Sequence, residues 1–218
     1  SVMTRFFLVR HGETEWNRLG RYQGHLNSPL TTLGRQQAQA AGRHLRRHHL
    51  EIIYSSDLGR AEETARLLQE AAQVPDAPLH LDTRLRERHM GVIQGQTREY
   101  AREHLTEAMA AYHSPDPDAL IEGGETLQQF YDRAVEVLQE IATRHAGRRI
   151  AVVTHGGWLV TVFRHLVGLD LSAPRRVDAF NASIHHVVGT QGGLRLRTWG
   201  VIDHLDGLQD HTNAMGQR

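Results

Sequence analysis

An apolar run that ends in Arg-His-Gly constrains the fold of this chain more than any other feature. Residues Phe6 to Val9 are typical of a buried strand in a parallel sheet, and Arg10 and His11 follow directly. Open α/β sheets bind ligands at the carboxyl ends of their strands, so we expect both side chains at that edge. A fixed positive charge beside an imidazole favours its neutral, nucleophilic form. The alternative is that Arg10 and His11 occupy an ordinary surface turn.

The overall composition excludes several functional classes. The 218 residues are sufficient for one α/β domain with a sizeable core. Lys and Arg number 25 and Asp and Glu number 25, so the net charge is zero. This balance argues against a nucleic-acid or membrane-surface binder, which would carry a basic excess. The absence of cysteine excludes disulfides, thiolate metal sites and cysteine nucleophiles.

The chain shows neither a membrane anchor nor a metal-binding signature. No apolar run approaches the length of a membrane span, and the N-terminal residues lack the apolar region of a signal peptide. We therefore expect a cytoplasmic protein. Of the sixteen histidines, His44, His48 and His49 lie near one face of a predicted helix, but no zinc signature accompanies them. We predict no functional metal.

Strand and helix patterns alternate along the chain. Predicted strands cover Phe6–Val9, Ile52–Tyr54, Leu79–Leu81, Arg149–Val153, Ile184–Val188 and Leu194–Trp199. Predicted helices run from Thr31 or Thr32 to His48, from a cap at Ser56 or Asp57 to Ala72, over Thr97–Ala111, from Thr126 to His145, and over Trp158–Val167. This order predicts an α/β protein with three layers, namely an open, mostly parallel sheet with helices on both faces and one antiparallel edge strand.

The chain contains no internal repeat and no linker long enough to divide it. We therefore expect one domain over residues 1–218. The segment 97–125 interrupts the alternation of strands and helices. We interpret this segment as a small helical lid over the strand tips.

A second strand end repeats the pattern of the first. The run Val152-Val153-Thr154 is followed by His155-Gly156, as Leu8-Val9-Arg10 is followed by His11-Gly12. If the two strands are neighbours, His11 and His155 face each other across one strand spacing of about 5 Å. Glycine after each histidine lets the backbone turn sharply and leaves room for a ligand.

A third candidate site follows the second predicted strand. The segment Ser55-Ser56-Asp57 leads into a helix whose first turn contains Arg60. The positive end of a helix beside an arginine suits an anion. Alternatively, Arg60 pairs with Glu62 or Glu63 on its own helix.

Glu87 is a fourth candidate because it lies among several basic residues, between Arg86 and Arg88. A carboxylate in that position is either a spacer held by ion pairs or a proton donor for a reaction at a bound phosphate. The residues alone do not decide between these two roles.

Together these segments resemble the histidine phosphatase superfamily, also called the phosphoglycerate mutase-like family. The resemblance extends from about residue 5 to residue 205. It rests on Arg10-His11-Gly12-Glu13-Thr14 with Asn17, on Ser55-Ser56-Asp57-Leu58 with Arg60-Ala61, on Glu87 with Gly91 and Gly95, and on Thr154-His155-Gly156-Gly157.

The resemblance implies a role for each candidate. His11 would be the nucleophile that carries the phosphoryl group, and Glu87 would protonate the leaving oxygen and then activate water. Arg10, Arg60 and His155 would hold the phosphoryl oxygens, with Asn17 lending its amide. Gln23, Gly24 and Gly156 would contact the substrate. No metal and no other cofactor would be required, because the arginines would neutralise the charge of the transition state.

The family contains both phosphatases and mutases, and this chain carries features of each. The loop Glu87–Gly91 is similar to that of the mutases, but the segment Gln96–Gly123 is shorter than the insertion of the cofactor-dependent enzymes. The segments Gly123–Leu127 and Trp199–Leu205 are similar to the phosphatase branch, and the combination most resembles the mutase-like broad-specificity phosphatases. A mutase must shelter its phosphohistidine from water, so a shorter lid favours hydrolysis.

We therefore predict a phosphomonoester hydrolase that acts through a phosphohistidine intermediate on a small phosphorylated metabolite. One alternative is a phosphoglycerate mutase that interconverts 3- and 2-phosphoglycerate and uses 2,3-bisphosphoglycerate as cofactor. The other is an inactive protein that binds phosphate esters, against which the presence of His11, His155 and Glu87 argues. We expect neither a nucleic-acid nor a membrane partner, and a homodimer stays open.

Overall fold

The structure is a computed structural model that describes residues 2–208. Within these residues, six strands form one sheet in the order β3-β2-β4-β1-β5-β6. The strands are β1 (Thr4–Arg10), β2 (Ile52–Ser55), β3 (Leu79–Leu81), β4 (Arg149–Thr154), β5 (Ile184–Thr190) and β6 (Gly193–Val201). The first four are mutually parallel, β5 is antiparallel to β1, and β6 is antiparallel to β5. The predicted α/β class, with a mostly parallel sheet and antiparallel pairing at one edge, is confirmed.

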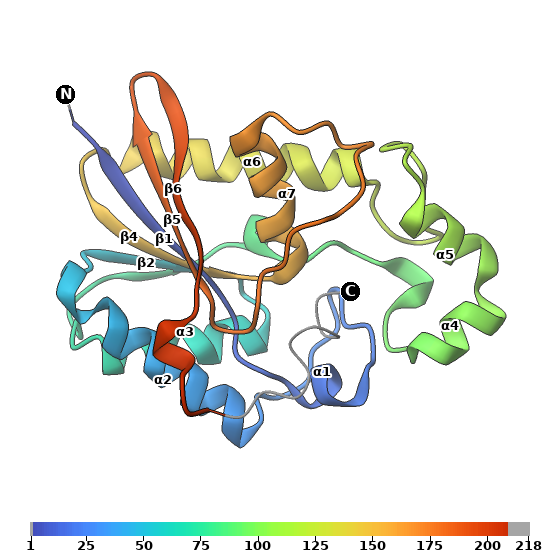
Figure 1. Cartoon of the computed structure of the whole chain (residues 1–218), viewed down its shortest axis with the longest axis horizontal. Coiled ribbons are helices and arrows are strands. Elements are labelled where there is room, and N and C mark those ends of the chain that lie inside the picture. Colours follow the sequence, from blue (N-terminus) through green and yellow to red (C-terminus); the bar gives the residue numbers. More distant parts are fainter. Residues whose placement is uncertain (1, 209–218) are drawn as a thin grey trace.

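Helices cover both faces of the sheet (Figure 1). The helices α2 (Thr32–Leu45) and α3 (Gly59–Ala71) lie on one face, and α6 (Leu127–Arg144) and α7 (Gly156–Val167) lie on the other. Alternate residues of β1 point to opposite faces, so Phe6 and Leu8 pack in the core beneath α6 and α7. Phe7 and Val9 pack in the core beneath α2 and α3. Burial on both faces explains the continuous apolar run of this strand.

A third, smaller core lies beside the end of the sheet. It contains α4 (Arg98–His104) and α5 (Thr106–His113), which lie to one side of the three layers in Figure 1. Ala101 and Ala108 from these helices are buried against Tyr22 and other residues of the preceding loops. We expected one helix over this segment, but the chain leaves helical geometry at Leu105. The break divides the segment into two short helices, each of which contributes apolar residues to the same core.

The remaining elements are short. They are α1 (Glu15–Leu19) and single 3₁₀ turns at Arg46–His48, Thr83–Leu85, Gly91–Ile93 and Asp203–Leu205. Over residues 2–208, none of the helices combines the length and the apolar character needed to cross a bilayer.

Side-chain caps explain where two of the long helices begin. Thr31 accepts a hydrogen bond from the backbone nitrogen of Gly34, as predicted for the start of α2. Thr126 and Gln129 form a reciprocal capping box at the start of α6. The predicted cap of α3 at Ser56 or Asp57 is wrong, because α3 begins after Leu58, which provides no side-chain cap.

Among the histidines of residues 2–208, three are buried, namely His11, His155 and His185. Burial lowers the pKa of His185 to about 3. The neutral ring accepts a hydrogen bond at Nδ1 from the backbone nitrogen of Gly200, and protonation would break this bond. Burial also holds the pKa values of His11 and His155 well below 6.5. All three rings are therefore neutral in the folded protein at neutral pH.

These lowered pKa values predict that acid destabilises the fold. Below pH 6.5 the unfolded chain binds protons that the folded protein does not, so the free energy of unfolding falls as the pH falls. The loss is absent above pH 6.5 and grows until the pH reaches the folded pKa. At pH 5, His185 alone should lower the free energy of unfolding by about 2 kcal/mol, which urea titrations at pH 7.5 and pH 5 would measure.

A substitution separates this effect from the general response to acid. His185→Gln should remove about 2 kcal/mol of the difference between the two pH values. His104→Gln is the matched control, because the side chain of His104 is exposed. The same loss of stability in His185→Gln as in the unmodified protein would contradict the prediction.

Candidate active site

The two strand-end histidines lie side by side. β1 and β4 pair in a register that places Arg10 opposite Thr154, and the next residue on each strand is a histidine. The backbone nitrogen of His11 donates to the carbonyl of Thr154 over 3.0 Å. The ring centroids of His11 and His155 are 5.2 Å apart, with one ring edge-on to the other. The predicted pairing of the two strand ends is therefore confirmed.

The backbone fixes the tautomer of His11. Its Nδ1 lies 2.8 Å from the carbonyl oxygen of Gly12. A carbonyl oxygen can only accept, so Nδ1 carries the proton and Nε2 keeps its lone pair. Burial, followed by the charges of Arg60 and Arg10, holds the pKa of His11 well below 6.5. Nε2 is therefore a free nucleophile at neutral pH.

His155 contacts the ring of His11 and is completely buried. Its Nε2 is 2.8 Å from Oγ of Ser56, which also accepts a hydrogen bond from the backbone nitrogen of Leu58. The hydroxyl of Ser56 can donate its single proton to Nε2, and in that arrangement the ring proton of His155 lies on Nδ1. Within residues 2–208, Nδ1 of His155 has no hydrogen-bond partner. A buried donor without a partner is costly, and an anion oxygen would satisfy it.

Arg10 lies at the end of β1, above the first residue of α7. Its Nη1 donates to the carbonyl of Ala179 over 2.9 Å. Gly156 allows this close packing, because a Cβ at that position would lie 3.2 Å from Nε of Arg10. The guanidinium is 2% exposed, which places a buried positive charge beside His11.

Arg60 is held by a loop and not by its own helix. Its Nη1 and Nη2 donate to the carbonyls of Leu26 and Gly24, at 2.6 and 2.7 Å. Burial lowers its pKa to about 10, so the group stays charged at neutral pH. The alternative pairing of Arg60 with Glu62 or Glu63 is wrong, since the guanidinium of Arg60 binds the loop and Glu62 forms its ion pair with Arg66.

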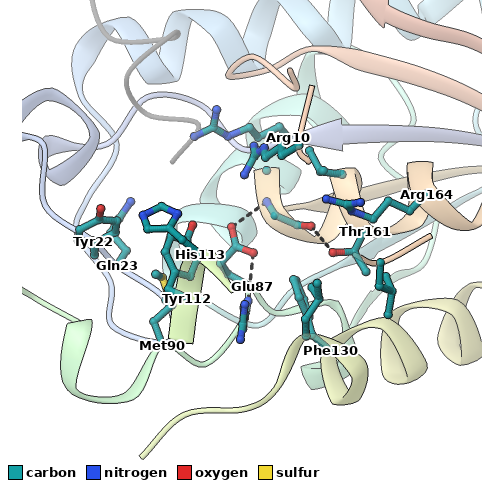
Figure 2. Close-up of a pocket in the computed structure, with 18 of the residues that line it drawn as sticks. Arg10, Tyr22, Gln23, Glu87, Met90, Tyr112, His113, Phe130, Thr161 and Arg164 are labelled. Atoms are coloured by element: carbon teal, nitrogen blue, oxygen red, sulfur yellow. Dashed lines mark hydrogen bonds between the residues drawn. The ribbon is translucent and has the colours of Figure 1, made fainter. Parts of the chain in front are cut away.

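Glu87 and Arg10 both line the cavity, and Glu87 lies below Arg10 in the view of Figure 2. Its Oε2 accepts from the backbone nitrogen of Gly157 over 2.9 Å, and its Oε1 accepts from that of Arg88 over 3.0 Å. A Cβ at position 157 would collide with Oε1 of Glu87, so glycine is required there for this contact.

Two residues that sequence reasoning missed hold the Glu87 loop in place. Arg133 on α6 donates to the carbonyls of Arg86 and Glu87, over 2.8 and 2.9 Å. Nε2 of His25 lies 2.9 Å from the same Glu87 carbonyl. Both residues are far from Glu87 along the chain, so no local pattern connects them with it.

The remaining predicted binding residues present amide groups. Oδ1 of Asn17 accepts from the backbone nitrogen of Thr14 in the capping box of α1, which leaves the amide nitrogen for a ligand. Oε1 of Gln23 accepts from the hydroxyl of Ser28, which likewise leaves the amide nitrogen of Gln23 for a ligand. Gly24 adopts a positive φ of 56°, and its carbonyl binds Arg60.

These groups line one cavity of about 590 Å³. The predicted residues in its wall are Arg10, His11, Asn17, Gln23, Gly24, Arg60, Glu87 and Gly156. His155 is not among the residues of the cavity wall, but its ring packs edge-on against that of His11, which is. Sequence reasoning did not assign a binding role to several other charged or polar wall residues, among them Arg88, Tyr112, His113, Arg164 and Arg175.

The charge of the cavity wall is strongly positive. Seven arginines line the cavity, whereas Glu87 contributes its one carboxylate. Across residues 2–208, no group of three or more His, Asp or Glu side chains could hold a metal ion. The arrangement suits an anion that accepts hydrogen bonds from guanidinium, imidazole and amide groups.

Comparisons with known proteins agree with this geometry. The profile of the histidine phosphatase superfamily (branch 1) matches residues 6–202. Phosphoglycerate mutase-like protein 4 of Arabidopsis thaliana is 39% identical over 203 residues, which is 91% of this chain and 86% of the relative. Metal-independent phosphoserine phosphatase of the same plant is 35% identical over 210 residues, covering 95% and 86%.

A solved structure shows the same fold. Phosphoserine phosphatase from Entamoeba histolytica, in complex with 3-phosphoglyceric acid, superposes with a TM-score of 0.80 at 26% identity, covering 93% of this chain and 99% of that one. The chain belongs to the histidine phosphatase superfamily, branch 1, and is a phosphatase of that type. The family predicted from the sequence is confirmed.

Proposed function

We propose that the protein is a metal-independent phosphomonoester hydrolase that acts on a small phosphorylated metabolite through a phosphohistidine at His11. The observation that carries the proposal is the state of His11. Its Nδ1 proton is bound by the carbonyl of Gly12, and its neutral ring lies in the field of Arg10 and Arg60. A nucleophilic lone pair at Nε2 therefore faces a site that attracts phosphate.

In the first step, Nε2 of His11 attacks phosphorus and the bond from phosphorus to the ester oxygen breaks. The leaving oxygen takes its proton from the carboxyl group of Glu87. Arg10 and Arg60 neutralise the phosphoryl oxygens, and Nδ1 of His155 donates a hydrogen bond to one of them. Such preorganised donors stabilise the charge that spreads over the oxygens in the loose transition state.

In the second step, water attacks the phosphohistidine. The carboxylate of Glu87 takes a proton from the water, the bond between nitrogen and phosphorus breaks, and inorganic phosphate forms. His11 returns to its neutral form with Nδ1 still bound to Gly12. One carboxyl group thus serves as acid in the first step and as base in the second.

A mutase is the second candidate, because one relative is named phosphoglycerate mutase-like protein 4. That reaction would use 2,3-bisphosphoglycerate and return the phosphoryl group to an organic acceptor. Another relative is named a metal-independent phosphoserine phosphatase, which favours hydrolysis.

We predict release of inorganic phosphate from a panel of phosphomonoesters, undiminished by excess chelator. Conversion of 3- to 2-phosphoglycerate with the cofactor, faster than phosphate release, would instead establish the mutase.

His11→Ala tests the nucleophile. The variant should lose at least about a thousandfold of the kcat for p-nitrophenyl phosphate, because no other group can form the covalent intermediate. Far-ultraviolet circular dichroism should be unchanged. Substrate labelled in its phosphoryl group should leave acid-labile label on the unmodified protein and none on the variant. His80→Ala, at an exposed residue of β3, is the control. Full activity of His11→Ala would exclude the proposed mechanism.

Glu87→Gln tests the acid. Its kcat/KM for phenyl phosphate should fall by about a hundredfold, and its kcat/KM for p-nitrophenyl phosphate by less, because a poor leaving group depends more on protonation. Gly157→Ala should act in the same direction, since the added Cβ displaces the Glu87 carboxylate. Gly192→Ala is the control, because its Cβ would make only ordinary contact. Equal losses for both esters would show that Glu87 is not the leaving-group acid.

A further inference from the structure

The cavity extends along α7, away from His11. The residues of α7 that line it are Gly156, Gly157, Val160, Thr161 and Arg164, which form one stripe of the helix. At 1.5 Å per residue, Cα of Arg164 lies about 12 Å along the helix axis from Cα of Gly156. Thr161 and Arg164 lie along this wall in Figure 2, to one side of Glu87. The two ends of the stripe are therefore well separated.

Arg164 brings a buried charge to the far end of the cavity. It is 7% exposed, and its Nη1 donates to the carbonyls of Asp170 and Ala173, over 3.0 and 2.8 Å. These carbonyls follow the end of α7, so they hold the guanidinium away from His11. Within residues 2–208, its Nε and Nη2 form no hydrogen bond.

No carboxylate pairs with Arg164 among the described residues. The carboxylate of Asp170 raises the pKa of Arg164 slightly, but its Oδ1 accepts from the backbone nitrogen of Ser172. Burial and the charge of Arg175 outweigh it and lower the pKa of Arg164. A buried guanidinium bonded only to carbonyls keeps its full positive charge, which is unfavourable unless an anion binds.

Arg175 adds a second positive charge at the same end. It is exposed, lines the cavity, and lies close enough to interact electrostatically with Arg164 and with the hydroxyl of Tyr112. Within residues 2–208, it forms no ion pair or hydrogen bond. Two like charges facing one cavity repel each other, and an anion between them would remove this repulsion.

We propose that Arg164 and Arg175 form a second anion site, and that the substrate is an elongated phosphomonoester with a phosphate or carboxylate at its other end. The proposal rests on the proposed function, since the reacting phosphate is held at His11. A six-carbon chain with anionic groups on both ends suits the separation along α7. The apolar side chains of Leu127, Phe130 and Val160 line the cavity and can pack against its carbon chain.

The test compares six-carbon phosphomonoesters that differ in their second group. Glucose 6-phosphate has an uncharged far end, 6-phosphogluconate has a carboxylate, and glucose 1,6-bisphosphate has a phosphate. We expect kcat/KM to be about ten- to a hundredfold higher for at least one doubly charged ester than for glucose 6-phosphate, mainly through KM. The ester with the larger ratio identifies the second group as phosphate or carboxylate.

Substitutions then assign the preference to the two arginines. Arg175→Met and Arg164→Met should bring the ratio close to one, Arg164→Lys should restore part of it, and Arg175→Glu should lower it further. Arg176→Met is the matched control, since Arg176 is an exposed neighbour outside the cavity wall, and it should keep the full ratio. Arg175 is exposed, so its variants test the site even if Arg164→Met unfolds.

The outcomes separate the second anion site from the hydrolase itself. A ratio near one in the unmodified protein, with p-nitrophenyl phosphate still hydrolysed, would overturn only the second anion site. A high ratio that persists in Arg175→Met and Arg164→Met would also overturn it. Failure to hydrolyse any phosphomonoester would overturn the proposed function.

Discussion

The in-register parallel pairing of β1 with β4 is the interaction on which the rest of the site depends. It aligns Arg10 with Thr154, so that the two following histidines leave the sheet together and their rings come within 5.2 Å. The apolar residues of both strands anchor this register, because a slip of one residue would exchange the two buried faces. The geometry of the nucleophile is thus set by the hydrophobic core as much as by hydrogen bonds.

The second organising constraint is the burial of positive charge. Arg10 and Arg60 are almost completely buried beside two buried histidines. Burial, followed by these charges, lowers the pKa values of His11 and His155, so both rings remain neutral. Backbone carbonyls bind Arg60 without neutralising it. Buried positive charges that lie close together repel each other, and a bound phosphate would offset this repulsion. The same logic applies to Arg164 at the far end of the cavity, where the ligand would supply the missing negative charge.

How much the sequence could predict depends on whether a residue's role is local. His11, His155 and Arg60 could be placed because each follows a strand, and strand ends in a parallel sheet share one edge. Arg133 and His25 could not, because only the tertiary fold brings them near the Glu87 loop. Arg164 and Arg175 could not, because only the tertiary fold shows that they line the same cavity as His11. The single domain, the lid role of residues 97–125 and a homodimer stay predictions.

Ser56 shows why local rules fail at a functional site. By position it should cap α3, and a side-chain cap stabilises a helix by about 1 kcal/mol. Instead its hydroxyl lies 2.8 Å from Nε2 of His155, and α3 begins without a side-chain cap. Asp57, the other expected cap, forms a bidentate ion pair with Arg86 beside Glu87. Both side chains thus position the groups that would handle phosphate, and the helix that follows them loses the stabilisation they could have provided.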